Sequence, residues 1–137
     1  MGTSKKTDEE KEKNKQVGAI KARITREETR LTAVFKNLPP NEKAVAVGLI
    51  QRAAYMRVTL EDYEKDINAG GSVEPFQQKA GAPSFDRVRP VAQLYTTLAK
   101  NYQTIIKQLT DLLPKGDEVS DPKKGDDGFD DFVNKKN

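Results

Sequence analysis

The chain has 137 residues, a third of them charged, with 24 Lys and Arg against 21 Asp and Glu. It contains no Cys and no His, which excludes disulfides, thiolate nucleophiles, zinc–thiolate sites and the usual general base of neutral pH. This length accommodates one domain, and no stretch approaches the roughly 20 apolar residues of a membrane span, so we expect a soluble cytoplasmic protein.

The two ends differ in charge. Residues 1–36 carry ten Lys and Arg against six Asp and Glu, whereas residues 115–137 carry five against seven. Residues 1–16 have no apolar residue after Met1 and are predicted to be a disordered arm; the alternative is that they extend the next helix as a charged, frayed first turn. We therefore expect a helical domain over residues 17–114, followed by a flexible acidic tail over 115–137, with different partners for the two ends.

A first helix is predicted over residues 18–37, because its apolar residues recur on one face until Pro39 and Pro40 end it. Its basic residues lie away from that face or on its edge. They are the candidate DNA contacts, which would bind mainly phosphates: Lys21, Arg23, Arg26 and Arg30. Glu27 is expected to pair with Arg23 and Arg30 at helical spacing.

A second, long helix is predicted over about 42–69, with a clean end at Gly70 and Gly71. Its apolar stripe includes Leu49, Met56 and Leu60. Arg57 interrupts the apolar part, and two interpretations remain open. Its stem covers apolar surface while the guanidinium reaches water, or it pairs with a carboxylate such as Asp86 or Asp111.

The connection over residues 70–89 has no sustained periodicity and is predicted to be a long loop, which Phe76 and Phe85 pin to the helices. A third helix follows over about 88–113, with apolar residues at heptad spacing. The predicted fold is thus all-α, with a long antiparallel helical hairpin. Core and part of an oligomer interface are expected at Leu49, Met56, Leu60, Val91, Tyr95, Leu98, Tyr102, Ile105 and Leu109.

The acidic tail places Phe129, Phe132 and Val133 among four aspartates. Such a segment is typical of peptides that dock on a basic partner, although a merely solubilising tail is the alternative. No phosphate-binding loop or catalytic triad occurs, and the carboxylate cluster at residues 61–66 has no His to complete a metal site. We expect a binding protein without enzymatic activity, metal or cofactor.

The run LIQRAAYMRVTLEDYEKDINAGG (49–71), with RPVA, NYQ and IIKQLTDLLP in residues 89–114, resembles small terminase subunits of tailed bacteriophages, in particular short, mostly helical ones from phages of Gram-positive bacteria. The resemblance spans roughly residues 17–115. It implies a ring-forming homo-oligomer of eight to ten copies in the host cell cytoplasm. Such a ring recognises double-stranded viral DNA and delivers it to the large terminase subunit, an ATPase and nuclease that starts packaging of the genome into procapsids.

The sequence departs from this family in one respect. Many small terminases carry an N-terminal helix-turn-helix, whereas here a single basic helix precedes the Pro39–Pro40 break. DNA is therefore expected to contact the first helix and the arm, with weak contacts added around a ring. The principal alternative is a helical homo-oligomeric assembly adaptor that binds no DNA. A dimeric transcriptional regulator is a more remote one.

Overall fold

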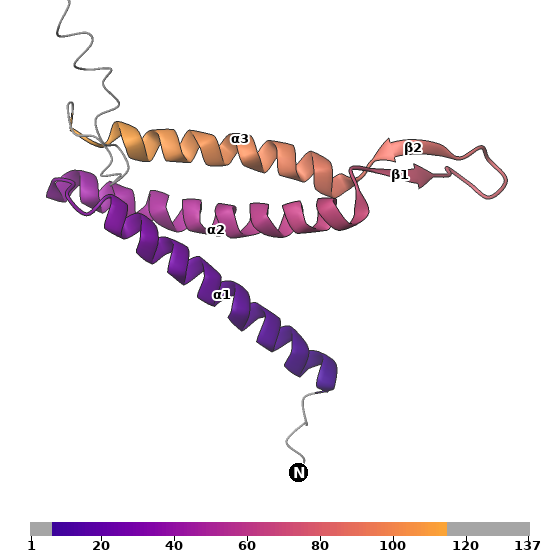
Figure 1. Ribbon diagram of the computed structural model, residues 1–137, viewed down its shortest axis with the longest axis horizontal. Coiled ribbons are helices and arrows are strands. Elements are labelled where there is room, and N and C mark those ends of the chain that lie inside the picture. The colour runs from indigo at the N-terminus through magenta and orange to yellow at the C-terminus, as the bar shows by residue number, and fades with distance from the viewer. Residues whose placement is uncertain (1–6, 115–137) are drawn as a thin grey trace, which may run out of the picture.

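The computed structural model describes residues 7–114, which form three helices and one short β-ribbon (Figure 1). Helix α1 spans Asp8–Val34, α2 spans Pro40–Gly70 and α3 spans Pro90–Asp111. Helices α2 and α3 lie side by side and antiparallel, whereas α1 contacts α2 near one end and then diverges from it (Figure 1). The predicted hairpin of α2 and α3 is confirmed, with each helix end within two residues of its expected position.

The predominantly helical fold is confirmed, but the connection between α2 and α3, which was expected to be a loop, contains a small two-stranded sheet. Strands β1 (Val73–Phe76) and β2 (Phe85–Val88) form an antiparallel ribbon that projects beyond the hairpin (Figure 1). Phe76 and Phe85 do not pin this segment to the helices; they face each other across the ribbon, with ring centroids 5.5 Å apart. Arg87 stacks over the Phe76 ring at 3.9 Å and pairs with Glu74, which closes a small cluster within the ribbon.

The base of the ribbon is fixed to the end of α2 by Arg89. Its guanidinium donates to the Gly71 carbonyl and to the Asp66 carboxylate, both at 2.8 Å. A Cβ at Gly70 would lie 2.8 Å from the Arg89 guanidinium, so a side chain at position 70 would displace this contact. Gly71 then ends α2 and leads the chain into β1 with a φ of 80°, a conformation that favours glycine.

Helix α1 begins ten residues earlier than predicted. The Thr7 hydroxyl accepts a hydrogen bond from the Glu10 amide, and Asp8, Glu9 and Glu10 place negative charge in the first turn. Both features stabilise a helix N-terminus, because they satisfy a free amide and complement the helix dipole. Residues 8–16 are therefore helical, although the sequence was expected to form a disordered arm up to residue 16.

The core lies at the end of the hairpin where α1 joins it. It is formed by Leu31, Phe35, Leu38, Ala46, Ile50, Ala53 and Leu109, with Leu49, Tyr102 and Ile105 packed against them. Of the predicted core residues, Leu60 and Leu109 are buried, and Met56, Val91, Tyr95 and Leu98 are half-buried. All residues of α1 from 8 to 22 are exposed, so this half of the helix projects away from the core.

Candidate nucleic-acid interface

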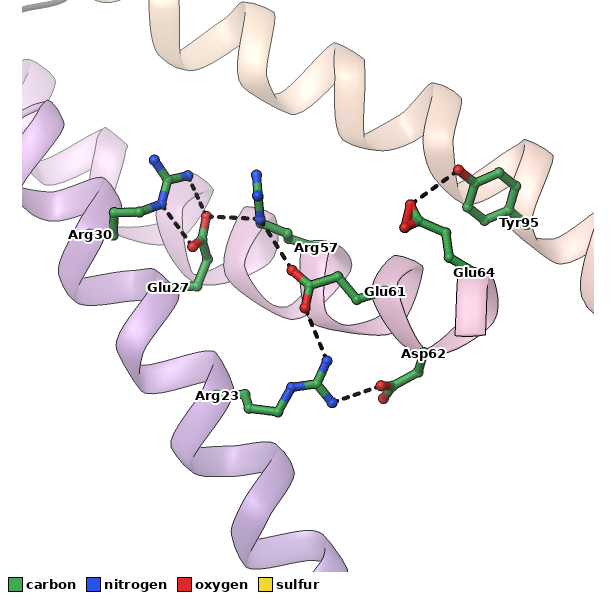
Figure 2. A network of polar contacts seen from close by, with 8 residues as sticks. All are labelled: Arg23, Glu27, Arg30, Arg57, Glu61, Asp62, Glu64 and Tyr95. Carbon is green, nitrogen blue, oxygen red and sulfur yellow. Dashed lines mark hydrogen bonds and ion pairs between the residues drawn. The ribbon is translucent and has the colours of Figure 1, made fainter. Parts of the chain in front are cut away.

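Six charged side chains form a continuous network where α1 and α2 begin to diverge (Figure 2). Arg23 of α1 donates to Asp62 at 2.7 Å and to Glu61 at 3.1 Å, both on α2. The Nε of Arg57 lies 3.4 Å from Glu61 and 3.7 Å from Glu27 of α1. The network then ends in Arg30, whose Nε and terminal nitrogen donate to the two oxygens of Glu27 at 2.9 and 2.6 Å.

Positive and negative groups alternate along this network, so each guanidinium has at least one carboxylate beside it. Two of the ionic links, Arg23 to α2 and Glu27 to Arg57, join α1 to the hairpin. They lie outside the apolar core, which ends at Leu31 in α1. The direction of the projecting half of α1 therefore depends on polar contacts.

Glu27 is the least exposed member of the network, with 11% of its side chain accessible. The bidentate hydrogen bonds from Arg30 hold the pKa of Glu27 below its ordinary value, with a smaller contribution from the charge of Arg57. The pKa of Arg57 is raised in turn, first by the hydroxyl of Tyr102 on α3 and then by Glu27. Glu27 is thus ionised at neutral pH. Its carboxylate contacts Arg30 of α1 and Arg57 of α2, and Arg57 in turn interacts with Tyr102 of α3.

Two sequence predictions about ion pairs are corrected by this geometry. Glu27 pairs with Arg30 as expected, but Arg23 turns to α2 and binds Glu61 and Asp62. Arg57 is indeed paired, although neither Asp86 nor Asp111 is its partner. These partners are set by the crossing of α1 over α2, which spacing along one helix does not encode.

An open hollow of about 450 Å³ lies on the same flank of α1. It is lined by Arg23, Arg26, Glu27, Arg30, Val58 and Glu61. Three of the four predicted DNA contacts therefore meet at one place. Lys21 is exposed and lies about 160° around the helix from Arg23, because two steps of about 100° make about 200°, which is about 160° the shorter way round. It is therefore apart from this hollow.

A second group of cations occupies the outward face of α1. Lys11, Lys15 and Arg26 fall within about 60° of the helix circumference, since steps of 4 and 11 residues return to nearly the same direction. All three are exposed, and no carboxylate pairs with them among the residues that the structure describes. The only other side chains in this sector after Lys11 are small ones, Ala22, Thr29 and Ala33. Lys11 and Lys15 belong to the arm that was expected to contact DNA, although they were not named individually as site residues.

The predicted oligomer residues face the inside of the chain. Tyr95, for example, is half-buried against α2 and donates a hydrogen bond to Glu64 at 3.2 Å (Figure 2). Exposed apolar side chains occur on the outward face of α2, where Val45 and Tyr55 are 57% and 60% exposed and lie within about 80° of each other around the helix. The proposed docking residues Phe129, Phe132 and Val133 lie outside the described residues.

Comparisons with known proteins add no assignment: no protein-family model, no curated protein and no solved structure matches the chain. Within residues 7–114, no three carboxylates gather in a way that would hold a metal ion. Over the same range, none of the helices combines the length and apolar character needed to cross a bilayer. The functional groups that the helices present to solvent are mainly charged side chains.

Proposed function

We propose that this chain is the small subunit of a bacteriophage packaging terminase, a homo-oligomeric protein that binds double-stranded viral DNA and presents it to the large ATPase and nuclease subunit. Support comes from the resemblance of residues 49–71 and 89–114 to that family and from the helical hairpin that those residues form. In this proposal the chain itself catalyses no reaction and needs no cofactor.

The observation that carries DNA binding is the basic outward face of α1, formed by Lys11, Lys15 and Arg26. A helix of 27 residues is about 40 Å long, so its projecting half can lie along a duplex without a clash from the hairpin. Flexible Lys and Arg side chains on such a face contact phosphates rather than base edges, and give affinity that falls with salt. Arg23 and Arg30, on the adjacent flank, extend the same surface.

The oligomeric part of the proposal relies on the outward face of α2. Val45 and Tyr55 lie on the same face as Gly48, a glycine inside a helix where a Cβ would meet nothing within 4 Å. Glycine lowers helix stability by about 1 kcal/mol relative to Ala, and no contact among residues 7–114 explains it here. Close approach of a second helix from another copy would explain both the glycine and the exposed apolar side chains. Replacing Gly48 with Leu should then reduce the mass of the assembly in sedimentation or native mass spectrometry while the monomer stays helical.

DNA binding is tested by titrating a generic duplex at several salt concentrations. The triple variant Lys11→Ala, Lys15→Ala, Arg26→Ala should bind more weakly, and the slope of log affinity against log salt should flatten by up to about 2.7, or 0.9 for each lost phosphate contact. The matched control removes three exposed cations of α2, Lys43, Arg52 and Lys65, and so changes the net charge equally. Equal losses in both variants would move the DNA site away from α1.

One observation favours the alternative, a homo-oligomeric adaptor without a DNA role. Arg23 and Arg30, two of the four predicted DNA contacts, already have carboxylate partners. If the chain is such an adaptor, the two arginines only stabilise the fold. The wild-type protein should then retain no duplex at physiological salt while its oligomer remains intact. DNA retention that depends on Lys11, Lys15 and Arg26 would exclude the adaptor.

A further inference from the structure

The ion pairs between Arg23 and α2 are open to solvent. The side chains of Arg23, Glu61 and Asp62 are 31%, 47% and 42% exposed, respectively. Water and solutes therefore reach the ion pairs from outside. A pair with this exposure contributes little stability and is weakened by salt, because solvent screens its charges.

The same arginine also lines the open hollow beside Arg26 and Arg30. The hollow is lined by three guanidinium groups and only two carboxylates, those of Glu27 and Glu61, so its walls have a net charge of +1. A phosphate group that enters it meets Arg26, which has no carboxylate partner in the described part of the chain. It also competes directly with Glu61 for Arg23.

Arg23 and Arg30 differ in how they can be released. Glu27 and Arg30 are on the same helix, so this ion pair is kept when α1 changes its direction. The partners of Arg23 are 38 and 39 residues away on α2, and separate from it when α1 turns away from the hairpin. Of these two arginines, only Arg23 is therefore bound to carboxylates whose distance from it changes with the position of the projecting helix.

We propose that Glu61 and Asp62 act as an autoinhibitory latch, in which α2 occupies Arg23 and holds α1 against the hairpin until the phosphates of double-stranded DNA replace the two carboxylates. This inference rests on the proposed DNA-binding function and adds its regulation. DNA that has first bound to Lys11, Lys15 and Arg26 brings phosphates to the hollow at high local concentration. Release of Arg23 then adds one phosphate contact and frees α1 to follow the duplex.

The test compares duplex binding by the wild type and by Glu61→Gln, Asp62→Asn at about 0.1 M salt. The variant should bind about five- to tenfold more tightly, and its salt slope should be steeper by about 0.9, as expected for one added phosphate contact. The control Glu42→Gln, Asp86→Asn removes two carboxylates that have no ion-pair partner within residues 7–114, and so matches the change in net charge. It should gain clearly less.

Arg23→Ala, added to both backgrounds, ties the gain to one side chain. It should abolish the gain of the Glu61→Gln, Asp62→Asn variant and change wild-type affinity only slightly. An equal gain in the control, or a gain that survives Arg23→Ala, would overturn the latch. If the double variant is too unstable to titrate, Asp62→Asn alone removes the 2.7 Å contact and should give part of the same gain.

The two proposals fail in different ways. Binding that depends on Lys11, Lys15 and Arg26 but does not tighten in Glu61→Gln, Asp62→Asn would overturn the latch and leave the DNA-binding function in place. Absence of duplex binding by every variant would overturn both.

Discussion

The two halves of α1 are held in different ways. The C-terminal half ends in Leu31 and Phe35, which are 4% and 6% exposed and pack with Leu109 of α3 in the apolar core. The N-terminal half, residues 8–21, is exposed throughout, and the nearest ion pairs that join α1 to the hairpin are those of Arg23 and Glu27. Stabilisation by apolar burial depends little on salt and pH, whereas stabilisation by ion pairs depends on both.

This difference indicates how one helix can serve two purposes. Its buried half fixes where α1 joins the domain, because core packing is dense and tolerates little change. Its projecting half keeps a basic surface in solvent and can change direction at low cost.

The largest effect is expected from Leu109→Ala, because Leu109 is fully buried between the helices. Loss of its side chain should lower the free energy of unfolding by about 2–4 kcal/mol through lost burial and a cavity. Leu94→Ala is the matched control on the same helix, since Leu94 is 55% exposed, and should change stability by less than about 0.5 kcal/mol. Denaturant unfolding followed by circular dichroism measures both, and equal effects would place the core elsewhere.

A smaller loss is expected from Glu27→Ala. It leaves Arg30 and Arg57 without their shared carboxylate, and should destabilise the fold by about 1–2 kcal/mol. Glu28→Ala makes the same change of residue one position along α1, where no hydrogen bond or ion pair is seen, and should be nearly neutral. Thermal unfolding of the two variants side by side decides the point, and similar melting temperatures would argue against a role for the network in stability.

The stabilisation by Glu27 should depend on pH. Its pKa in the folded protein lies below the ordinary value of 4.5, owing to Arg30 on α1 and Arg57 on α2. A carboxyl group with a lowered pKa stabilises the fold fully above its unfolded pKa and loses that effect as pH falls through the folded one. The stability difference between wild type and Glu27→Gln should therefore be constant above about pH 5 and shrink below it. A difference that stays constant down to pH 3 would contradict this account.

The smallest effects concern two glycines, Gly48 inside α2 and Gly71 just after its end. Gly48→Ala adds a methyl group in open space within the helix and should stabilise the monomer by about 0.5–1 kcal/mol. Gly71→Ala should destabilise it by a similar amount, because its φ of 80° is unfavourable for a residue with a Cβ. Urea midpoints of the two variants should shift in opposite directions. Shifts of the same sign would contradict either the open space at Gly48 or the positive φ at Gly71.

The sequence predicted the hairpin well because its two helices carry apolar stripes that persist over many turns, as at Val91, Leu98, Ile105 and Leu109. It missed the β-ribbon because each strand has only four residues, and the stabilising pair of Phe76 and Phe85 is made across the ribbon. The early start of α1 did have a local signal, the Thr7-x-x-Glu10 spacing typical of a helix N-terminus.

The candidate site was predicted only in part. Arg23, Arg26 and Arg30 lie on one flank because their spacing of three and four residues is helical, and this was visible in the sequence. The partners of Arg23 were not, because Glu61 and Asp62 are 38 and 39 residues away and approach it only through the crossing of α1 over α2.

Apolar packing fixes the base of α1, and ion pairs fix its direction. Spin-label distances test this division most directly, because the chain has no Cys and accepts label pairs at Gln16 and Ala69, across the open side, and at Ala33 and Gln51, near the core. In 1 M salt, or with Glu61→Gln, Asp62→Asn, the Gln16–Ala69 distances should broaden while the Ala33–Gln51 distances stay unchanged. A Gln16–Ala69 distribution that remains narrow under both conditions would contradict the claim.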